Sequence, residues 1–314
     1  MTHREQKIVL LGGAGLVGQN LAIRLKEQGY RNLVVVDKHR ANLAILRRLH
    51  PDITAAHADL AEQGDWAQHV KDAGVVVMLQ AQIGAATAAP FIRNNLATTA
   101  HILAAIRRYE VPYTVHISSS VVESSAVDDY TTTKRQQERL VLESGITCVV
   151  LRPTLMFGWF DRKHLGWLSR FMHTTPVFPV PGHGRFVRQP LYAGDFCNLI
   201  ISCIRSRISG QVFNITGLQR VTFIDMVREL RRATESRCAI LRIPYPLFHL
   251  LLRLWTLVDS DPPFTTDQLT ALTAGDEFEI IDWERIFGVM ATPFRMAIDE
   301  TFRHPVYSKI VLEF

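Results

Sequence analysis

Short runs of apolar residues alternate along this chain with longer stretches in which apolar positions recur every three to four residues. The short runs predict buried strands, and the periodic stretches predict helices with one buried face. The predicted strands are 7–11, 33–36, 53–56, 74–79, 113–117, 146–151 and 211–215. The predicted helices among them are 19–28, 42–49, 95–109 and 132–143. This alternation indicates an α/β fold with a doubly wound parallel sheet.

The first predicted strand leads directly into a glycine-rich turn with the sequence GGAGLVG. Gly12 allows the chain to turn sharply off the strand, and Gly18 allows the following helix to pack closely on it. Gly15 lets backbone N–H groups approach a pyrophosphate, which any Cβ at that position would obstruct. Leu16 and Val17 lie in the same turn, ahead of the helix whose N-terminus attracts the negative charge, and are expected to contact the cofactor. These residues predict a dinucleotide site.

The second predicted strand ends on Asp37. A carboxylate at this point can accept hydrogen bonds from the adenosine ribose hydroxyls, and it would repel a 2′-phosphate. This favours NAD as the cofactor over NADP, although Lys38, His39 and Arg40 follow at once and weaken the preference. Strand, glycine turn, helix and terminal acid together predict a Rossmann-like unit.

Composition changes between two parts of the chain. Residues 157–186 and 218–314 are richer in proline, histidine and aromatic residues, whereas the strand at 211–215 rejoins the sheet. We expect residues 1–156, with a return segment at about 187–217, to form the NAD-binding Rossmann domain. The other two segments should form a smaller C-terminal α/β domain that binds substrate beside the carboxyl ends of the strands.

Charge and cysteine content narrow the class of protein. The chain has 314 residues, a net charge of +5 and 28 arginines against 7 lysines. A nucleic-acid partner is not expected, because the basic residues are scattered, whereas anionic small ligands suit the arginines. The four cysteines form no CxxC pair, which predicts reduced thiols in a cytoplasmic protein. The 12 histidines do not cluster at metal-ligand spacing, so no metal site is expected.

The longest apolar stretch, 243–258, is interrupted by His249 and Arg253 and is too short to span a bilayer. We expect it to form an amphipathic helix that packs on the second domain or on a partner subunit, with shallow membrane contact as the alternative. The polar residues 1–6 give no sign of a secretion signal, since the first strand starts directly after them.

Tyr130 and Lys134 are four residues apart, a spacing that places two side chains on one face of a helix. The neighbouring ammonium favours a phenolate, so we expect the Tyr130 pKa to be lowered toward neutrality. The pair follows the predicted strand 113–117 and a run of serines at 118–120, as a catalytic helix bordering a nicotinamide should. These residues predict acid/base chemistry beside the cofactor.

With this constellation, the sequence resembles the extended short-chain dehydrogenase/reductases, a family of sugar-nucleotide epimerases, dehydratases and reductases. The glycine turn, Asp37, Tyr130 and Lys134 match the family's cofactor and acid/base positions. The resemblance implies that Asp59 and Leu60 contact the adenine, and that Gln80 and Pro153 contact the cofactor. Asn95 matches a structural position of the cofactor site, and Ser120 matches the catalytic serine that hydrogen-bonds the reacting oxygen. Arg188, with Arg185, is expected to bind a substrate pyrophosphate. The resemblance also implies a homodimer through 95–109 and 132–143.

Three features depart from the family pattern. Only ten positions separate Ser120 from Tyr130, so a loop on the substrate side is missing. Gln80 starts a Gln-Ala-Gln sequence where many members have His-x-Ala. Residues 278–280 read Phe-Glu-Ile near the place where sugar-nucleotide enzymes commonly have a second phosphate-binding arginine. The last difference weakens a nucleotide-sugar substrate and leaves the cofactor unaffected.

Three functions remain open at this point. The first is NAD-dependent epimerisation of a nucleotide- or diphosphate-linked hexose, in which Tyr130 deprotonates a ring hydroxyl and Ser120 steadies the oxygen. The second is NAD(P)H-dependent reduction of a keto-sugar or another carbonyl by the same residues. The third is a cofactor-binding accessory protein without turnover.

Overall fold

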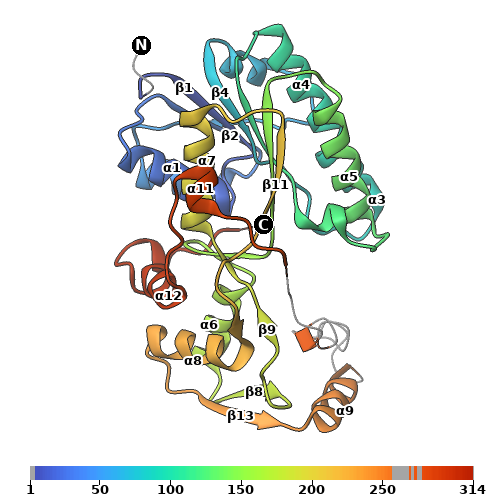
Figure 1. Cartoon of the computed structure of the whole chain (residues 1–314), viewed down its shortest axis with the longest axis vertical. Coiled ribbons are helices and arrows are strands. Elements are labelled where there is room, and N and C mark those ends of the chain that lie inside the picture. The colour runs from blue at the N-terminus through green and yellow to red at the C-terminus, as the bar shows by residue number, and fades with distance from the viewer. Residues whose placement is uncertain (1–3, 257–268, 270–271, 274–277, 314) are drawn as a thin grey trace.

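A seven-stranded parallel sheet forms the centre of the larger lobe in the computed structural model, which describes residues 4–256, 269, 272–273 and 278–313 (Figure 1). The strand order is β11-β6-β5-β4-β1-β2-β3. The bounds are β1 Lys7–Leu11, β2 Leu33–Asp37, β3 Thr54–His57, β4 Ala73–Met78, β5 Thr114–Ile117, β6 Cys148–Pro153 and β11 Gln211–Ile215. The predicted doubly wound parallel sheet is therefore confirmed, and no strand bound differs from its prediction by more than two residues.

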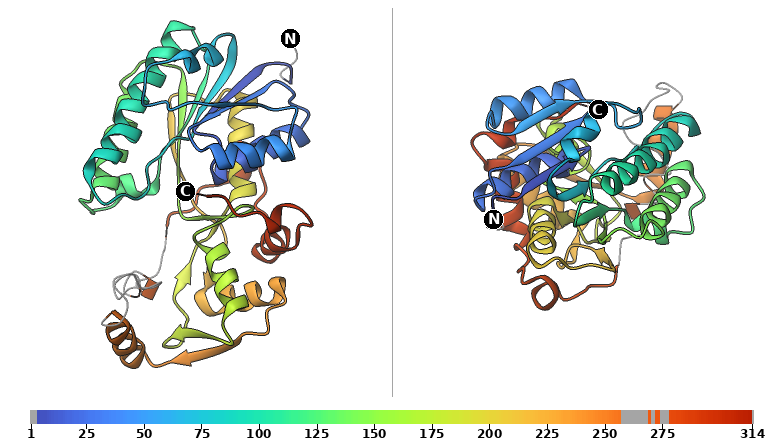
Figure 2. Two further views of the ribbon diagram at one scale, coloured as in Figure 1. Left: turned by 180° about the vertical axis from the view of Figure 1, so that it is seen from behind. Right: turned by 90° about the horizontal axis from the view of Figure 1, so that it is seen from above.

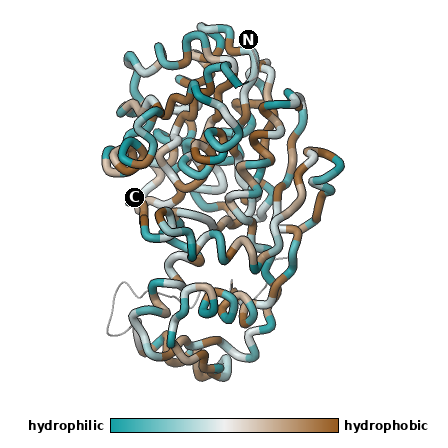
Figure 3. The backbone as a smooth tube through the Cα atoms, turned by 90° about the vertical axis from the view of Figure 1, so that its left-hand side faces the viewer, coloured by the Kyte–Doolittle hydropathy of each residue, from teal (hydrophilic) through white to brown (hydrophobic). Residues whose placement is uncertain are grey.

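Helices cover both faces of this sheet, because alternate strand side chains point to opposite sides. Ile8 and Leu10 pack into one core with α1, α2 and α7, whereas Val9 and Leu11 pack into another with α4 and α5. The helices are α1 Leu16–Glu27, α2 Arg40–Leu49, α4 Thr98–Arg108, α5 Asp129–Leu142 and α7 Ala193–Ser206. Figure 2 shows the two layers of helices, and Figure 3 shows hydrophobic stretches running through the interior of this lobe.

Short helical elements lie between or after these strands and helices. They are the 3₁₀ helices η1 Asp65–Val70, η3 Ser120–Glu123 and η4 Tyr307–Lys309, the helix α3 Ala88–Phe91 and the π-helix η2 Ile92–Ala97. The helix expected at 95–109 therefore starts as a π-helix and continues as α4. A π-helix often marks a functional site, and Asn95 lies inside this one.

A second, smaller lobe has its own hydrophobic core, in which Met172, Phe178 and Val227 are buried. Its elements are α6 Leu165–Thr174, β8 Val177–Pro181, α8 Phe223–Thr234, β13 Ala239–Ile243, α9 Tyr245–Thr256 and α12 Phe294–Arg303. Three two-stranded sheets complete it or join it to the first lobe: β13 with β8, β12 Val221–Thr222 with β9 Val187–Arg188, and β10 Leu191–Tyr192 with β7 Met156–Phe157. The architecture is thus a Rossmann-like lobe with a smaller α/β lobe.

Two stretches near the C-terminus return to the first lobe. Helix α11, Trp283–Phe287, packs on α7, and the Ser202 hydroxyl donates a 2.5 Å hydrogen bond to the carbonyl of Phe287. Farther on, the Asn42 side chain exchanges hydrogen bonds with the backbone of Glu313. Part of the segment 218–314, expected wholly in the substrate-binding domain, therefore contacts the larger lobe.

Among the described residues, no helix combines the length and the apolar character needed to cross a membrane. Within the same residues, no cluster of three or more His, Cys, Asp or Glu side chains is arranged to hold a metal ion. The four cysteines, Cys148, Cys197, Cys203 and Cys238, are buried free thiols.

Candidate active site

The three glycines after β1 differ in what surrounds them. Gly12 has a φ of +75°, and a Cβ added there would lie 2.6 Å from backbone atoms of Gln80. A Cβ at Gly18 would lie 2.2 Å from the carbonyl oxygen of Gly13. At Gly15, by contrast, a Cβ would meet nothing within 4 Å. The protein's own packing therefore requires the outer two glycines, whereas the middle one leaves open space beside the start of α1.

That open space fits an anionic cofactor. Gly15 is the N-cap of α1 and has no side chain to accept hydrogen bonds from the first helical turn, which begins with Leu16 and Val17. The N–H groups of a first turn have no partner within the helix, and they attract phosphate oxygens. The residues present therefore fit the pyrophosphate of a dinucleotide.

Asp37 links the glycine turn to the end of β2. Its Oδ2 accepts a 2.9 Å hydrogen bond from the N–H of Ala14, and its Oδ1 accepts one of 3.0 Å from the N–H of His39. A carboxylate can accept about four hydrogen bonds, so this one retains capacity for two ribose hydroxyls. Asp37 is where the sequence predicts the ribose acid.

Asp59 and Leu60, the predicted adenine neighbours, have different surroundings. Leu60 is buried in the core beneath α4. The Asp59 carboxylate accepts a hydrogen bond from the Ala61 N–H and another, of 2.9 Å, from Arg93 on η2. Lys38 donates a 3.0 Å hydrogen bond to Asn94 on the same helix. Sequence reasoning missed that η2 brings Arg93 to Asp59, because no local pattern links these distant positions.

Helix α5 carries the predicted acid/base pair. It starts at an N-cap, Asp128, whose Oδ1 accepts a 2.8 Å hydrogen bond from the N–H of Thr131. Tyr130 lies in the first turn, half-buried, with its ring 6.5 Å from that of Phe91. Burial raises the pKa of Tyr130, a hydrogen bond with the Ser119 side chain opposes that shift, and the Asp128 charge adds to it. The phenol is therefore protonated at neutral pH.

Lys134 lies one turn farther along α5 and is almost completely buried. Its Nζ donates a 2.5 Å hydrogen bond to Oε1 of Gln137 and a 3.2 Å hydrogen bond to the carbonyl of Ile117. Burial lowers the pKa of Lys134 to about 7, against the opposing charge of Glu138. The expectation that Lys134 lowers the Tyr130 pKa was wrong for this state, because burial dominates and the ammonium bonds to other groups.

The three serines after β5 have separate roles. The Ser118 hydroxyl donates a 2.5 Å hydrogen bond to the buried carboxylate of Glu138. Ser119 caps η3 by accepting from the N–H of Val121, and it also bonds to Tyr130. Ser120, the predicted catalytic serine, is the first residue of η3 and is half-exposed. The structure therefore adds Ser119 as the serine that contacts the phenol.

A buried polar network ties α5 to β4 and η2. The side-chain amides of Gln80 and Gln137 both donate to the hydroxyl of Thr99, at 3.2 and 3.0 Å. Asn95 donates a 3.0 Å hydrogen bond to the hydroxyl of Thr133 and accepts one from the backbone N–H of Gln82. This network fixes the helix that carries Tyr130 against the carboxyl edge of the sheet.

Arg152 joins the serine segment to the same helix. Its guanidinium pairs with the buried carboxylate of Glu138 and with Glu123 on η3, each at 2.5 Å. Pro153 follows it at the end of β6, directly opposite Ile215 of β11. The strand end that carries Pro153 is thus held in place by an ion pair.

The predicted phosphate-binding arginines lie in and beside β9. Arg188 is half-buried, and its guanidinium donates a 3.1 Å hydrogen bond to the carbonyl of Leu272. Arg185 is exposed, and its backbone N–H donates to the ring of His183. The acid/base helix and these arginines therefore belong to different parts of the molecule, as they must if a substrate binds between two lobes.

A model of the NAD dependent epimerase/dehydratase family matches residues 8–216. The chain belongs to this family and is an enzyme of the extended short-chain dehydrogenase/reductase type, whose members are NAD-dependent epimerases, dehydratases and reductases.

Curated relatives include reductases. A 4-hydroxy-2-methyl-3-oxo-4-farnesyl-3,4-dihydroquinoline-1-oxide ketoreductase of Stigmatella aurantiaca is 27% identical, covering 74% of this chain and 75% of the relative. A ceramide reductase of Caulobacter vibrioides is 23% identical, covering 97% of this chain and 95% of the relative.

Solved structures share the fold. The UDP-glucuronic acid 4-epimerase of Bacillus cereus, in complex with UDP-glucuronic acid and NAD, has a TM-score of 0.69. It is 19% identical, and the match covers 95% of this chain and 98% of the neighbour. Since this and further neighbours were solved with NAD or NADH, they agree with an NAD-type cofactor.

Proposed function

We propose that this protein reduces a ketone to a secondary alcohol with an NAD-type cofactor, and that Tyr130 donates the proton. The observation that carries this proposal is the placement of the phenol, which lies in the first turn of α5 beside Ser119, at the carboxyl edge of the sheet; burial there raises its pKa. A phenol that retains its proton at neutral pH suits donation to a carbonyl oxygen, whereas an oxidation would begin with a phenolate.

When bound, a reduced nicotinamide supplies the hydride that adds to the carbonyl carbon. Tyr130 transfers its phenolic proton to the carbonyl oxygen, which becomes the hydroxyl of the product. The Ser119 hydroxyl then donates a hydrogen bond to the phenolate that remains, and this stabilises the charge. The phenolate regains a proton from solvent before the next turnover.

The names of relatives support reduction as the direction. Two of them are called reductases, and one of these aligns with 97% of this chain. Asp37 supports NADH as the electron donor, since its carboxylate suits unsubstituted ribose hydroxyls. Lys38 and Arg93 lie on the same side of the site, so NADPH is compared in the test.

Arg188 favours a second candidate, the epimerisation of a nucleotide- or diphosphate-linked hexose. A half-buried guanidinium in the smaller lobe suits a diphosphate, and Arg185 supplies a further charge. In this reaction, Tyr130 first accepts a proton from a ring hydroxyl and later returns it. That order requires bound cofactor to lower the pKa of Tyr130.

In a first experiment, the purified protein is denatured and any released nucleotide is identified. In a second, the native protein is assayed for oxidation of NADH and NADPH with ketone substrates. We expect ketone-dependent oxidation, and we expect Tyr130→Phe to reduce it by about a thousandfold while nucleotide binding is retained. Tyr109→Phe, at the C-cap of α4, is the matched control and should retain activity. About one NAD per protein with no net oxidation would favour the epimerase, and full activity in Tyr130→Phe would overturn both assignments.

A further inference from the structure

Helix α9 lies at the far end of the smaller lobe (Figure 1). Several of its leucines are exposed to solvent. Leu247, Leu250, Leu251 and Leu254 are spaced three and four residues apart and therefore lie on one face, here called the leucine face. Each of these four side chains is 46–52% exposed. The buried side of the helix is marked by Phe248. A contiguous exposed apolar face of this kind marks an interaction site.

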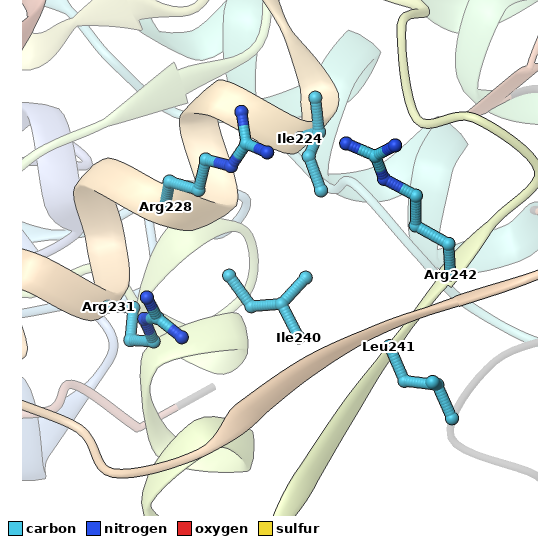
Figure 4. A pocket seen from close by; sticks show the side chains of 6 residues that line it. All are labelled: Ile224, Arg228, Arg231, Ile240, Leu241 and Arg242. Atoms are coloured by element: carbon cyan, nitrogen blue, oxygen red, sulfur yellow. The ribbon is translucent and has the colours of Figure 1, made fainter.

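The surface beside α9 is basic. Residues 220–256 contain seven arginines and only three carboxylates, so this segment holds most of the chain's net charge of +5. Arg228 and Arg231 project from α8 and Arg242 from β13 around a hollow that also includes Ile224 and Ile240 (Figure 4). All three arginines are exposed.

One arginine of the hollow, Arg228, has a carboxylate partner beside it. Asp225 pairs with Arg228 at 2.9 Å and accepts a hydrogen bond from Thr222. Arg231 donates only a weak 3.5 Å hydrogen bond to the carbonyl of Cys238. Three guanidinium groups thus lie near one carboxylate, which leaves two positive charges that can bind phosphate groups.

We propose that the leucine face and these arginines dock the protein on an anionic lipid bilayer. β13 ends at Ile243 and α9 starts at Tyr245, so Arg242 lies only a few residues before the leucine face in the chain. A leucine face with flanking arginines matches the acyl-chain and phosphate layers of a membrane interface. The 12 residues of α9 are too few to span the bilayer, so the contact is with one leaflet. This inference is independent of the proposed reduction.

The test measures co-sedimentation of the full chain with vesicles of phosphatidylcholine, with and without phosphatidylglycerol. We expect binding to the anionic vesicles that weakens as salt is raised. The double variant Leu250→Ser/Leu254→Ser should lower that binding by about tenfold or more. Removing Arg231 or Arg242 should lower it by about fivefold each and reduce the preference for phosphatidylglycerol.

Met296→Ser, at an exposed position on α12, is the matched control and should bind vesicles like the natural protein. Folding is checked by the thermal unfolding midpoint of each variant. No sedimentation with either vesicle, or equal sedimentation of natural and leucine-face variants, would overturn the proposal. A dimer that dissociates in the leucine-face variant, without vesicle binding by the natural protein, would overturn it in favour of a second copy of the chain. Activity on a water-soluble ketone is measured separately, so failure of the reductase assignment leaves this result interpretable.

Discussion

The two lobes place polar and apolar side chains in opposite ways. In the larger lobe, Lys134, Gln137 and Glu138 are buried along one side of α5 and bond to partners inside the protein. In the smaller lobe, the Arg228–Asp225 pair is exposed to solvent, and the leucine face of α9 is exposed as well. The first arrangement fixes atoms for chemistry, and the second presents a surface for contact. Substitutions should therefore have larger effects on stability in the first lobe.

The largest expected effect is at the glycine turn. Gly12→Ala combines a φ of +75° with a Cβ 2.6 Å from the Gln80 backbone, so it should lower the free energy of unfolding by about 4 kcal/mol or prevent folding. Gly182, in the smaller lobe, also has a positive φ, of +57°, but has room for a Cβ. Gly182→Ala should cost only about 1 kcal/mol. Urea unfolding of both variants makes the comparison, and equal losses would contradict it.

Gly15→Ala separates stability from binding at the same turn. With nothing within 4 Å of the added Cβ, the unfolding free energy should not change, whereas dinucleotide affinity should fall. Calorimetric titration with NADH measures that affinity. Unchanged affinity would show that the open space beside α1 is not the pyrophosphate site.

Buried and exposed ion pairs give the next largest contrast. Glu138→Ala leaves the Arg152 guanidinium, which is 19% exposed, without its buried carboxylate, so it should cost about 3 kcal/mol. Glu229→Ala removes a more exposed partner of Arg232 on α8, and it should cost less than about 1 kcal/mol. Denaturant midpoints of the two variants test this difference. A larger loss for Glu229→Ala would reverse the comparison.

The buried lysine predicts a pH dependence of stability. Since the pKa of Lys134 is lowered to about 7, the unfolded chain binds more protons than the folded one between that value and the ordinary lysine pKa. Stability attributable to this group is therefore lost as pH falls toward 7 and recovered as pH rises. Between pH 7 and 9, the natural protein should gain about 2 kcal/mol relative to Lys134→Met. Parallel pH profiles of the two proteins would mean that Lys134 is not held in this state.

The sequence predicted those parts of the site that depend on local backbone. The positions of Gly12, Gly18 and Asp37 follow from one strand, one turn and one helix, whose apolar periodicity is visible in the chain. The bonding of Lys134 could not be predicted. Gln137 is near in the sequence, but the second partner is the carbonyl of Ile117 on β5, which only the tertiary fold brings close. Similarly, the five-residue helix α11 is too short for its periodicity to show which lobe it joins.

The smallest expected effect concerns two serines that each make a specific hydrogen bond. Adjacent serines have the same chemistry, so only the 3₁₀ turn at η3 distinguishes Ser119, which bonds to Tyr130, from Ser120. Ser119→Ala should lower turnover by about tenfold and shift the pH at which Tyr130 loses its proton upward, because a bond that stabilises the phenolate is lost. In the smaller lobe, Ser236 donates a 2.7 Å hydrogen bond to the carbonyl of Met172. Ser236→Ala should cost about 1 kcal/mol of stability without changing turnover or its pH profile. If Ser120→Ala shifts the profile and Ser119→Ala does not, the phenol's working partner is Ser120, because substrate or cofactor has rearranged the turn.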